Sequence, residues 1–326
     1  MNTVDASRLS LDRIAEAART VDPVFLHSPQ FLSEPLSEQL GCRLTLKVET
    51  LNPIRSFKGR GADFFVEKLV QRGDSGPLVC ASAGNIGQGL AYACRSRGLS
   101  LTVFAARNAN SLKVERMRAL SAEVHLAGDD FDAAKEHAQQ SAARVGARMV
   151  VDGEAPEITE GAGSIGVELL ARGDTFDAVL VPLGDGALLN GVARWVKAFA
   201  PSTRMIGVCS RGAPAVAESF RRGRGASPVT HQRTDTIADG IAVRVPIPEA
   251  VEDMFGLVDE VLLVDDREII EAMRLVHRQV GLVVEPAGAA GLAALLGGAT
   301  AFRAQRVATI LCGGNVTAEQ LRAWLA

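Results

Sequence analysis

Lys58 is the residue whose type and position first suggest chemistry. It lies in the stretch NPIRSFKGRG, where Ser56 has the residue type of a helix N-cap. Apolar residues from Phe64 to Val70 recur at helical spacing, and Gly73 would end this helix, so Lys58 falls in its first turn. A cation is disfavoured there because a helix N-terminus carries partial positive charge. Two interpretations remain: a solvated lysine, or an amine whose pKa is lowered by the dipole and by burial so that it acts as a nucleophile.

Three glycine-rich turns offer a binding site for an anion. They are Ala81–Gly89, Pro182–Gly191 and Cys312–Asn315, and each begins at the end of a short apolar run. In an open α/β sheet, ligands bind beyond the carboxyl ends of the strands, where exposed N–H groups and helix N-termini attract anions. We therefore expect these turns and Lys58 to converge on one crevice that holds an anionic ligand.

Short apolar runs alternate with segments of helical periodicity along the chain. This alternation predicts an α/β fold with open, mostly parallel sheets covered by helices. No repeat and no low-complexity linker interrupts it, so a domain boundary would be a crossing of the chain between two lobes. The expected strands are Pro77–Ala81, Leu101–Phe104, Ala178–Leu183, Met205–Cys209, Val261–Val264 and Val307–Cys312, and the expected helices include Phe131–Val145 and Arg267–Val280.

The composition limits the classes of function. With 326 residues, 47% of them hydrophobic, the chain can bury a large core and form about two domains. A net charge of −3 gives no electrostatic reason to expect binding to nucleic acid or to an anionic membrane. The longest uncharged run, Pro286–Phe302, is rich in alanine and glycine and is interpreted as a buried helix, not a membrane span.

The cysteines and the N-terminal segment indicate a reducing compartment. The five cysteines are scattered without a CxxC pair, and the first twenty residues lack the apolar core of a signal peptide. We therefore expect a cytoplasmic protein. The sequence has no HExxH motif and no Cys/His cluster at zinc spacing, so we expect no metal site.

The segment GAGSIG, Gly161–Gly166, matches the dinucleotide-binding pattern GxGxxG. That fingerprint must follow a strand immediately, whereas the polar residues GEAPEITE precede this segment. Its Ser164 also approaches the spacing of a nucleophile elbow, but Ala162 replaces the first glycine of that motif. We interpret the segment as a packed or ligand-flanking helix start.

Taken in order, the motifs resemble those of the fold type II pyridoxal-phosphate enzymes, and the serine/threonine dehydratase group most closely. SFKGRG, SAGNIGQG, the turn after VLVPL, TIADGIAV, EPAGAAGLAAL and CGGN follow one another between Pro35 and Asn315. The resemblance implies a two-lobed fold similar to the tryptophan synthase β subunit. Residues 77–152 would form the small mobile domain, and residues 1–76 and 153–326 the large cofactor-binding domain. It also implies a homodimer.

The resemblance assigns a role to each residue of the site. Lys58 would bind pyridoxal 5'-phosphate covalently and remove the Cα proton of the amino-acid substrate as a base. Phe57 would pack near the pyridine ring, Asn85 would contact the phenolic oxygen, Cys312 would face the pyridine nitrogen, and Gly184, Asp185, Gly186, Ala187 and Leu188 would bind the phosphate. The substrate would be bound by Ser82, Ala83, Gly84, Asn85 and Gln88.

The reaction implied by the resemblance is β-elimination of a small hydroxyamino acid, such as serine, threonine or hydroxyaspartate, to a 2-oxo acid and ammonia. A thiol at Cys312 cannot keep the pyridine nitrogen protonated as an aspartate would, so a long-lived carbanion is disfavoured. Racemisation requires a second acid, which the racemases supply as a serine between Ser82 and Gly84. This chain has Ala83 there, and alanine carries no proton. Elimination is therefore favoured over racemisation.

Several residues depart from the family pattern and leave alternatives open. A carboxylate at Asp185 would repel a phosphate unless the side chain points away. Arg55 replaces a small residue and is either solvated or able to reach an acidic substrate side chain. Ile86 replaces a usual histidine, which keeps β- or γ-replacement open as in cysteine or threonine synthases. Cys209 stands where relatives that bind a cation carry a glutamate. A non-catalytic binder of amino acids or cofactor on the same fold remains a further alternative.

Overall fold

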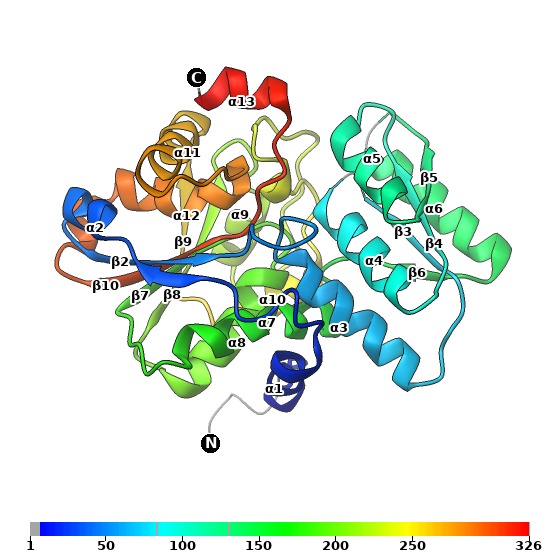
Figure 1. The fold of residues 1–326 in the computed structure, drawn as a ribbon, viewed down its shortest axis with the longest axis horizontal. Helices are drawn as coiled ribbons and strands as arrows, with labels where there is room; N and C mark the ends of the chain where they lie inside the picture. Colours follow the sequence, from blue (N-terminus) through cyan, green and yellow to red (C-terminus); the bar gives the residue numbers. More distant parts are fainter. Residues whose placement is uncertain (1–6, 83, 130, 326) are drawn as a thin grey trace.

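The computed structural model describes residues 7–325 of the chain except Ala83 and Asp130. Two β-sheets lie side by side, and helices cover both faces of each (Figure 1). The larger sheet has the spatial order β1 (Gln30–Leu32), β2 (Arg43–Val48), β10 (Arg306–Leu311), β7 (Ala178–Pro182), β8 (Arg204–Ser210) and β9 (Glu260–Val264). The smaller sheet has the order β5 (Glu123–Leu126), β4 (Leu101–Ala105), β3 (Leu78–Ala81) and β6 (Arg148–Val150).

Both sheets are parallel, apart from the edge strand β1, which pairs antiparallel with β2. The predicted α/β fold with mostly parallel sheets is thus confirmed, and each expected strand is found within one or two residues of its predicted ends. Strand β7, with the sequence AVLVP, is buried along its whole length because helices cover both of its faces.

Helices α2 (Glu34–Leu40), α11 (Asp266–Val280) and α12 (Pro286–Gly297) cover one face of the larger sheet. The opposite face is covered by α7 (Pro156–Leu170), α8 (Ala187–Phe199), α9 (Ala215–Arg222) and α10 (Pro248–Met254). The predicted buried helix is confirmed as α12, followed by the 3-10 turn η3 (Ala299–Phe302). The Asp265 and Glu268 side chains form a capping box at the start of α11, and Gly281 ends that helix at a φ of 71°.

The smaller sheet packs α6 (Phe131–Val145) on one face. On its other face lie α4 (Asn85–Ser96), α5 (Ser111–Ala119) and the apolar side of α3 (Lys58–Gln71). The chain enters this sheet after α3 and returns to the larger sheet at α7, and these two helices pack against each other. Helix α1 (Leu11–Thr20) packs on α7, and α13 (Ala318–Leu325) packs on α11 (Figure 1).

The GAGSIG segment is the interior of α7, not a helix start as predicted. Its glycines allow close contact between helices. A Cβ at Gly161 would lie 2.6 Å from the carbonyl oxygen of Arg60 in α3, and a Cβ at Gly163 would lie 2.9 Å from the carbonyl oxygen of Gly191 in α8. Both distances are shorter than a carbon–oxygen contact allows, so α7 packs between α3 and α8 only because it is glycine-rich.

A buried ionic network fixes the first turns of α3 to the strand before it and to α7. The Arg60 guanidinium, which is fully buried, binds Glu49 at 2.8 Å and Glu168 at 2.6 Å. Lys47, also buried, binds the other oxygen of Glu168 at 2.5 Å. Its central residue, Arg60, lies two residues after Lys58 in the same helix, so the network also holds the start of α3 in place.

Candidate functional site

Lys58 lies in the first turn of α3, as expected, although the N-cap position belongs to Phe57 and not to Ser56. The Ser56 hydroxyl instead accepts a hydrogen bond from the Lys58 N–H at 3.3 Å. The Lys58 amine is not solvated. Its Nζ lies 2.5 Å from an oxygen of Asp152 and 2.8 Å from an oxygen of Asp185.

The two carboxylates reverse the expected shift in the pKa of Lys58. Burial acts to lower that pKa, but the charges of Asp152 and Asp185 outweigh burial and raise it. The prediction of a lowered pKa was therefore wrong for this arrangement, because it considered the helix dipole and burial without an anionic partner. Burial and the charge of Asp185 raise the pKa of Asp152 to about 7. In this arrangement the Lys58 amine therefore keeps its proton near neutral pH, and Asp152 is the nearest carboxylate to it.

Asp185 sits in the turn that was expected to bind phosphate. Its Oδ1 accepts a hydrogen bond of 2.9 Å from the N–H of Ala187, the first residue of α8, while its Oδ2 binds Lys58. The carboxylate therefore points into the site, not away from it. Burial acts to raise the pKa of Asp185, but the Lys58 charge outweighs burial and lowers it. The Asp185 side chain therefore accepts the Ala187 N–H, which a phosphate bound in this turn would need as a donor.

The backbone of this turn requires glycine at two positions. Gly186 has a φ of 98°, a left-handed conformation that a side chain disfavours. A Cβ at Gly184 would lie 2.8 Å from the carbonyl oxygen of Gly240, in the TIADGIAV segment. The anion that the turn holds in this structure is the Asp185 carboxylate, which shows that the N-terminus of α8 attracts negative charge.

The turn before α4 and the first turn of that helix contain the predicted substrate-binding residues Ser82, Gly84, Asn85 and Gln88. The Ser82 hydroxyl is nearly buried and accepts hydrogen bonds from the N–H groups of Gly84 and Gly87, both at 3.1 Å. Ser82 therefore fixes the start of α4. The amide of Gln88, also buried, lies 3.5 Å from the Asn85 side-chain oxygen. The predicted position Ala83 lies outside the described residues.

Asn85 connects the smaller sheet to the larger one. Its amide donates a hydrogen bond of 2.7 Å to Glu285, and its oxygen accepts one of 2.8 Å from the side chain of Asn315. Glu285 is buried at the start of α12 and also accepts the N–H of Asn315 at 3.1 Å. The first and the third glycine-rich turns therefore meet at this network, while the second turn reaches Lys58 through Asp185.

The hydrophobic side of the site contains Phe57 and Cys312. Both are buried in the same apolar cluster as Leu188, and the Lys58 amine lies 4.8 Å from the centre of the Phe57 ring. The Phe57 N–H donates to the Cys312 carbonyl at 3.0 Å, so the Lys58 loop is held against the end of β10. Burial raises the pKa of the Cys312 thiol, so Cys312 stays neutral.

Sequence reasoning did not identify Asp152, Lys113 and Asp239. Asp152 lies two residues after the end of β6, so its position after a strand was the available signal. Lys113, buried on α5, binds Asp239 at 2.5 Å, and Asp239 belongs to the short turn η2 (Asp239–Ile241). Burial acts to lower the pKa of Lys113, but Glu285 and Asp239 outweigh burial and raise it. This ion pair joins the two sheets, and no sequence pattern relates residues 126 positions apart.

The described residues contain no group of three histidine, cysteine, aspartate or glutamate side chains that could hold a metal ion. Cys209, which stands where relatives that bind a cation carry a glutamate, is buried and donates to the carbonyl of Leu183 at 3.3 Å. Within the described part of the chain, no helix has the length and apolar character needed to cross a membrane.

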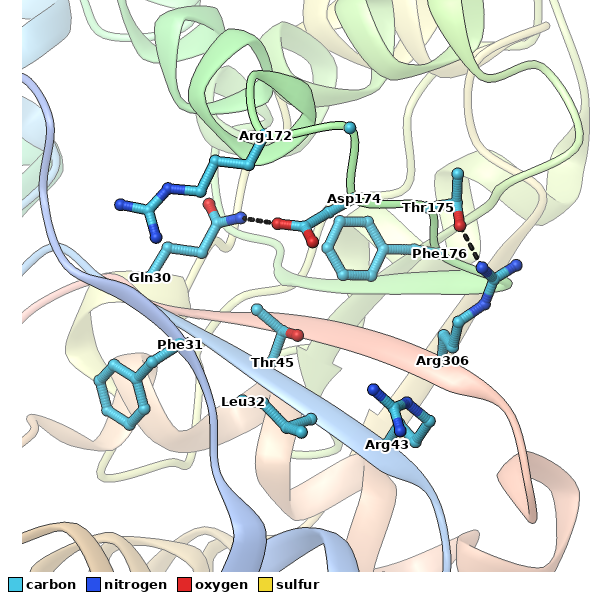
Figure 2. A pocket seen from close by; sticks show the side chains of 11 residues that line it. Gln30, Phe31, Leu32, Arg43, Thr45, Arg172, Asp174, Thr175, Phe176 and Arg306 are labelled. Carbon is cyan, nitrogen blue, oxygen red and sulfur yellow. Dashed lines mark hydrogen bonds between the residues drawn. The ribbon is translucent and has the colours of Figure 1, made fainter.

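A pocket of about 420 Å³ lies at the opposite edge of the larger sheet, near the amino ends of β2, β7 and β10 (Figure 2). Arg43, Arg172 and Arg306 line it, and Gln30 binds Asp174 across it at 3.0 Å. The residues described above follow the carboxyl ends of the strands. This pocket is therefore separate from the Lys58 site.

The donors of the site match the requirements of pyridoxal phosphate. A primary amine, a glycine turn at a helix N-terminus and a neutral apolar wall meet within one region. The single misfit is Asp185, whose carboxylate competes with a phosphate for the N–H of Ala187.

Comparison with known proteins agrees with this arrangement. Residues 23–313 match the family described as pyridoxal-phosphate dependent enzyme. L-threonine ammonia-lyase from Thermotoga maritima is 35% identical over 311 residues, covering 94% of this chain and 76% of that protein. The structure of maize serine racemase superposes with a TM-score of 0.88 at 29% identity, covering 97% of this chain and 96% of that one. A pyridoxal 5'-phosphate-dependent aspartate racemase superposes with a TM-score of 0.89 at 28% identity, covering 97% and 98%.

Proposed function

This chain belongs to the pyridoxal-phosphate dependent enzyme family, and we propose that it is an ammonia-lyase that removes the β-hydroxyl group of a small hydroxyamino acid. The observation that carries the proposal is the position of the Lys58 amine, between two carboxylates and beside the glycine turn at the start of α8. The similarity to an L-threonine ammonia-lyase over 94% of the chain supports the same reaction class. The products would be a 2-oxo acid and ammonia.

The protein's own residues would divide the work as follows. The bound cofactor supplies electron withdrawal from the Cα of the substrate amino acid. Lys58 would bind the cofactor and then serve as the base that takes the Cα proton, and Asp152 Oδ2 would accept the proton that Lys58 must lose to react. The Ser82–Asn85 turn would bind the substrate carboxylate. Phe57 and Cys312 would form the apolar wall against the ring.

The net reaction conserves every atom of the hydroxyamino acid. The Cα proton and the β-hydroxyl group leave as water, which produces an enamine. Hydrolysis of its imine tautomer takes up one water and releases ammonia and the 2-oxo acid. Excluding water from the site until the enamine has formed would prevent side reactions of the substrate.

We propose that residues 77–152 form a small domain that moves against the rest of the chain. The four-stranded sheet lies within this range. Polar contacts join it to the larger sheet, including Lys113 with Asp239 and Asn85 with Glu285. Water can replace the partners of such polar contacts when the two parts separate, which suits opening for substrate and closing over it. We further propose a cytoplasmic location, since all five cysteines are free and buried, as in a reducing compartment. The proposal of a homodimer rests on the family resemblance alone.

The test is a panel of L- and D-serine, L- and D-threonine and the hydroxyaspartates with the cofactor-loaded protein. We expect one of them to yield 2-oxo acid and ammonia in equal amounts without any added nucleophile. Turnover only in the presence of a second nucleophilic substrate would indicate β- or γ-replacement instead. Inversion of the amino acid without ammonia release would indicate racemisation. Full cofactor occupancy with no change in any amino acid would indicate a binding protein.

Asp185→Asn is expected to tighten cofactor binding at least about tenfold, because it removes a negative charge beside the phosphate turn. Asparagine retains an oxygen that can accept the N–H of Ala187, so the start of α8 should remain intact. The measurement is a spectroscopic titration of cofactor-free protein with pyridoxal phosphate.

Asp174→Asn, in the pocket at the opposite edge of the sheet, is the matched control and should leave this affinity unchanged. An unchanged or weaker affinity in Asp185→Asn would mean that Asp185 supports the bound cofactor and does not compete with it.

A further inference from the structure

Arg55 adopts a backbone conformation that an arginine does not favour. Its φ is 52°, in the left-handed region, which a residue with a side chain disfavours relative to glycine. The Arg55 carbonyl accepts a hydrogen bond of 2.9 Å from the N–H of Gly314, so the end of β10 holds this loop in place. The side chain is exposed and lies three residues before Lys58. The sequence therefore retains a strained arginine at the edge of the site, where glycine would cost less.

Arg116 approaches the same place from the other sheet. It lies on α5, and its guanidinium donates to the side-chain oxygen of Asn315. The same Asn315 side chain donates to Asn85 at 2.8 Å and to the carbonyl of Ile54 at 2.8 Å, next to Arg55. Arg116 is thus two hydrogen bonds from Asn85, in the turn proposed to bind the substrate carboxylate.

Arg116 contacts Asn315 directly, Arg55 adjoins it through Ile54, and neither arginine has an anionic partner among the described residues. Burial lowers the pKa of Arg116, and the charge of Arg55 lowers it further, as expected for two neighbouring cations. In the described part of the chain, neither arginine has a carboxylate within ion-pair distance. By contrast, Lys113, one turn earlier on α5, is neutralised by Asp239. Among Arg55, Lys113 and Arg116, only the two arginines are cations without an ion-pair partner, and both lie beside the turn proposed to bind the substrate carboxylate.

We propose that Arg55 and Arg116 bind the distal carboxylate of a dicarboxylic hydroxyamino acid, so that the preferred substrate class is 3-hydroxyaspartate. This inference rests on the proposed ammonia-lyase function. Guanidinium groups bind carboxylates with two parallel hydrogen bonds, and an anion between the two arginines removes their mutual repulsion. The reaction is balanced: one 3-hydroxyaspartate loses water across Cα and Cβ, takes water back on hydrolysis, and gives one 2-oxobutanedioate and one ammonia.

The first measurement is the ratio of kcat/KM for 3-hydroxyaspartate to kcat/KM for threonine, in the wild type and in Arg55→Gly and Arg116→Gln. Glycine accepts a φ of 52° without strain, so Arg55→Gly should fold. We expect the wild type to favour 3-hydroxyaspartate, and each variant to lower this ratio at least about tenfold, mainly through KM. Arg118→Gln, on the exposed side of α5, is the matched control and should leave the ratio unchanged.

The second measurement is binding of an unreactive dicarboxylate to the cofactor-loaded protein. Malonate should raise the thermal midpoint of the wild type more than acetate does, and this difference should disappear in both variants. Elimination of serine or threonine with no preference for 3-hydroxyaspartate, or a ratio unaffected by both substitutions, would overturn this inference and leave the ammonia-lyase function intact. If no hydroxyamino acid is eliminated, the proposed function fails. In that case, malonate binding that is lost in both arginine variants would still support an anion site at Arg55 and Arg116. Malonate binding that does not depend on these arginines would overturn the anion site as well.

Discussion

Replacing Lys58 with alanine is expected to lower turnover of the hydroxyamino acid at least about a thousandfold. The expected loss is large because one amine would both attach the cofactor and take the Cα proton, so no neighbouring group replaces it. Asp152 and Asp185 would then face each other without the cation that now lies 2.5 and 2.8 Å from them. The measurements are the visible absorption of the cofactor-loaded variant, and the release of 2-oxo acid with and without an added small primary amine.

The matched control for this substitution is Lys68→Ala. Lys68 lies on the same helix and pairs with Glu16 at 2.5 Å, away from the glycine turns. Its replacement should leave the absorption and the turnover unchanged. Partial recovery of Lys58→Ala by the added amine would identify the missing group as a base, since a folding defect would not respond to it. Turnover by Lys58→Ala close to that of the wild type would exclude Lys58 from the reaction.

Much of the fold could be predicted because local signals are strong in this chain. Strands such as β7 are continuous apolar runs, and parallel strands buried on both faces have that pattern. The interior of α7 was misjudged because GAGSIG has the composition of a turn. Its glycines serve contacts with α3 and α8, and such contacts between distant segments leave no local pattern.

The site was only partly predictable for a related physical reason. Lys58 and the three turns could be found because each has a local signature at the end of a strand or the start of a helix. The state of the Lys58 amine depends instead on Asp152 and Asp185, which lie 94 and 127 residues away. Without those partners the helix dipole and burial predict a lowered pKa, whereas the assembled site raises it.

Arg60→Met is expected to lower the free energy of unfolding by about 3–5 kcal/mol, since it leaves buried carboxylates without a cation. Arg60 is fully buried and binds Glu49 and Glu168, both of which would remain. Arg72→Met, just beyond the end of α3, is the matched control because its ion pair with Glu157 is largely exposed on the arginine side. That substitution should cost less than about 1 kcal/mol. Both values follow from denaturant unfolding of the two variants.

The same network predicts how stability depends on pH. Burial acts to raise the pKa of Glu168, but Arg60 and Lys47 outweigh burial and lower it from 4.5 to about 2. Between these two values the unfolded chain binds more protons at Glu168 than the folded chain does, so stability falls as the pH falls. The full shift corresponds to about 3 kcal/mol above pH 5. Glu168→Gln should therefore destabilise the protein near pH 7, and its difference from the wild type should shrink by roughly half between pH 5 and pH 3. A difference that stays constant over this range would show that the contribution of Glu168 does not depend on its charge.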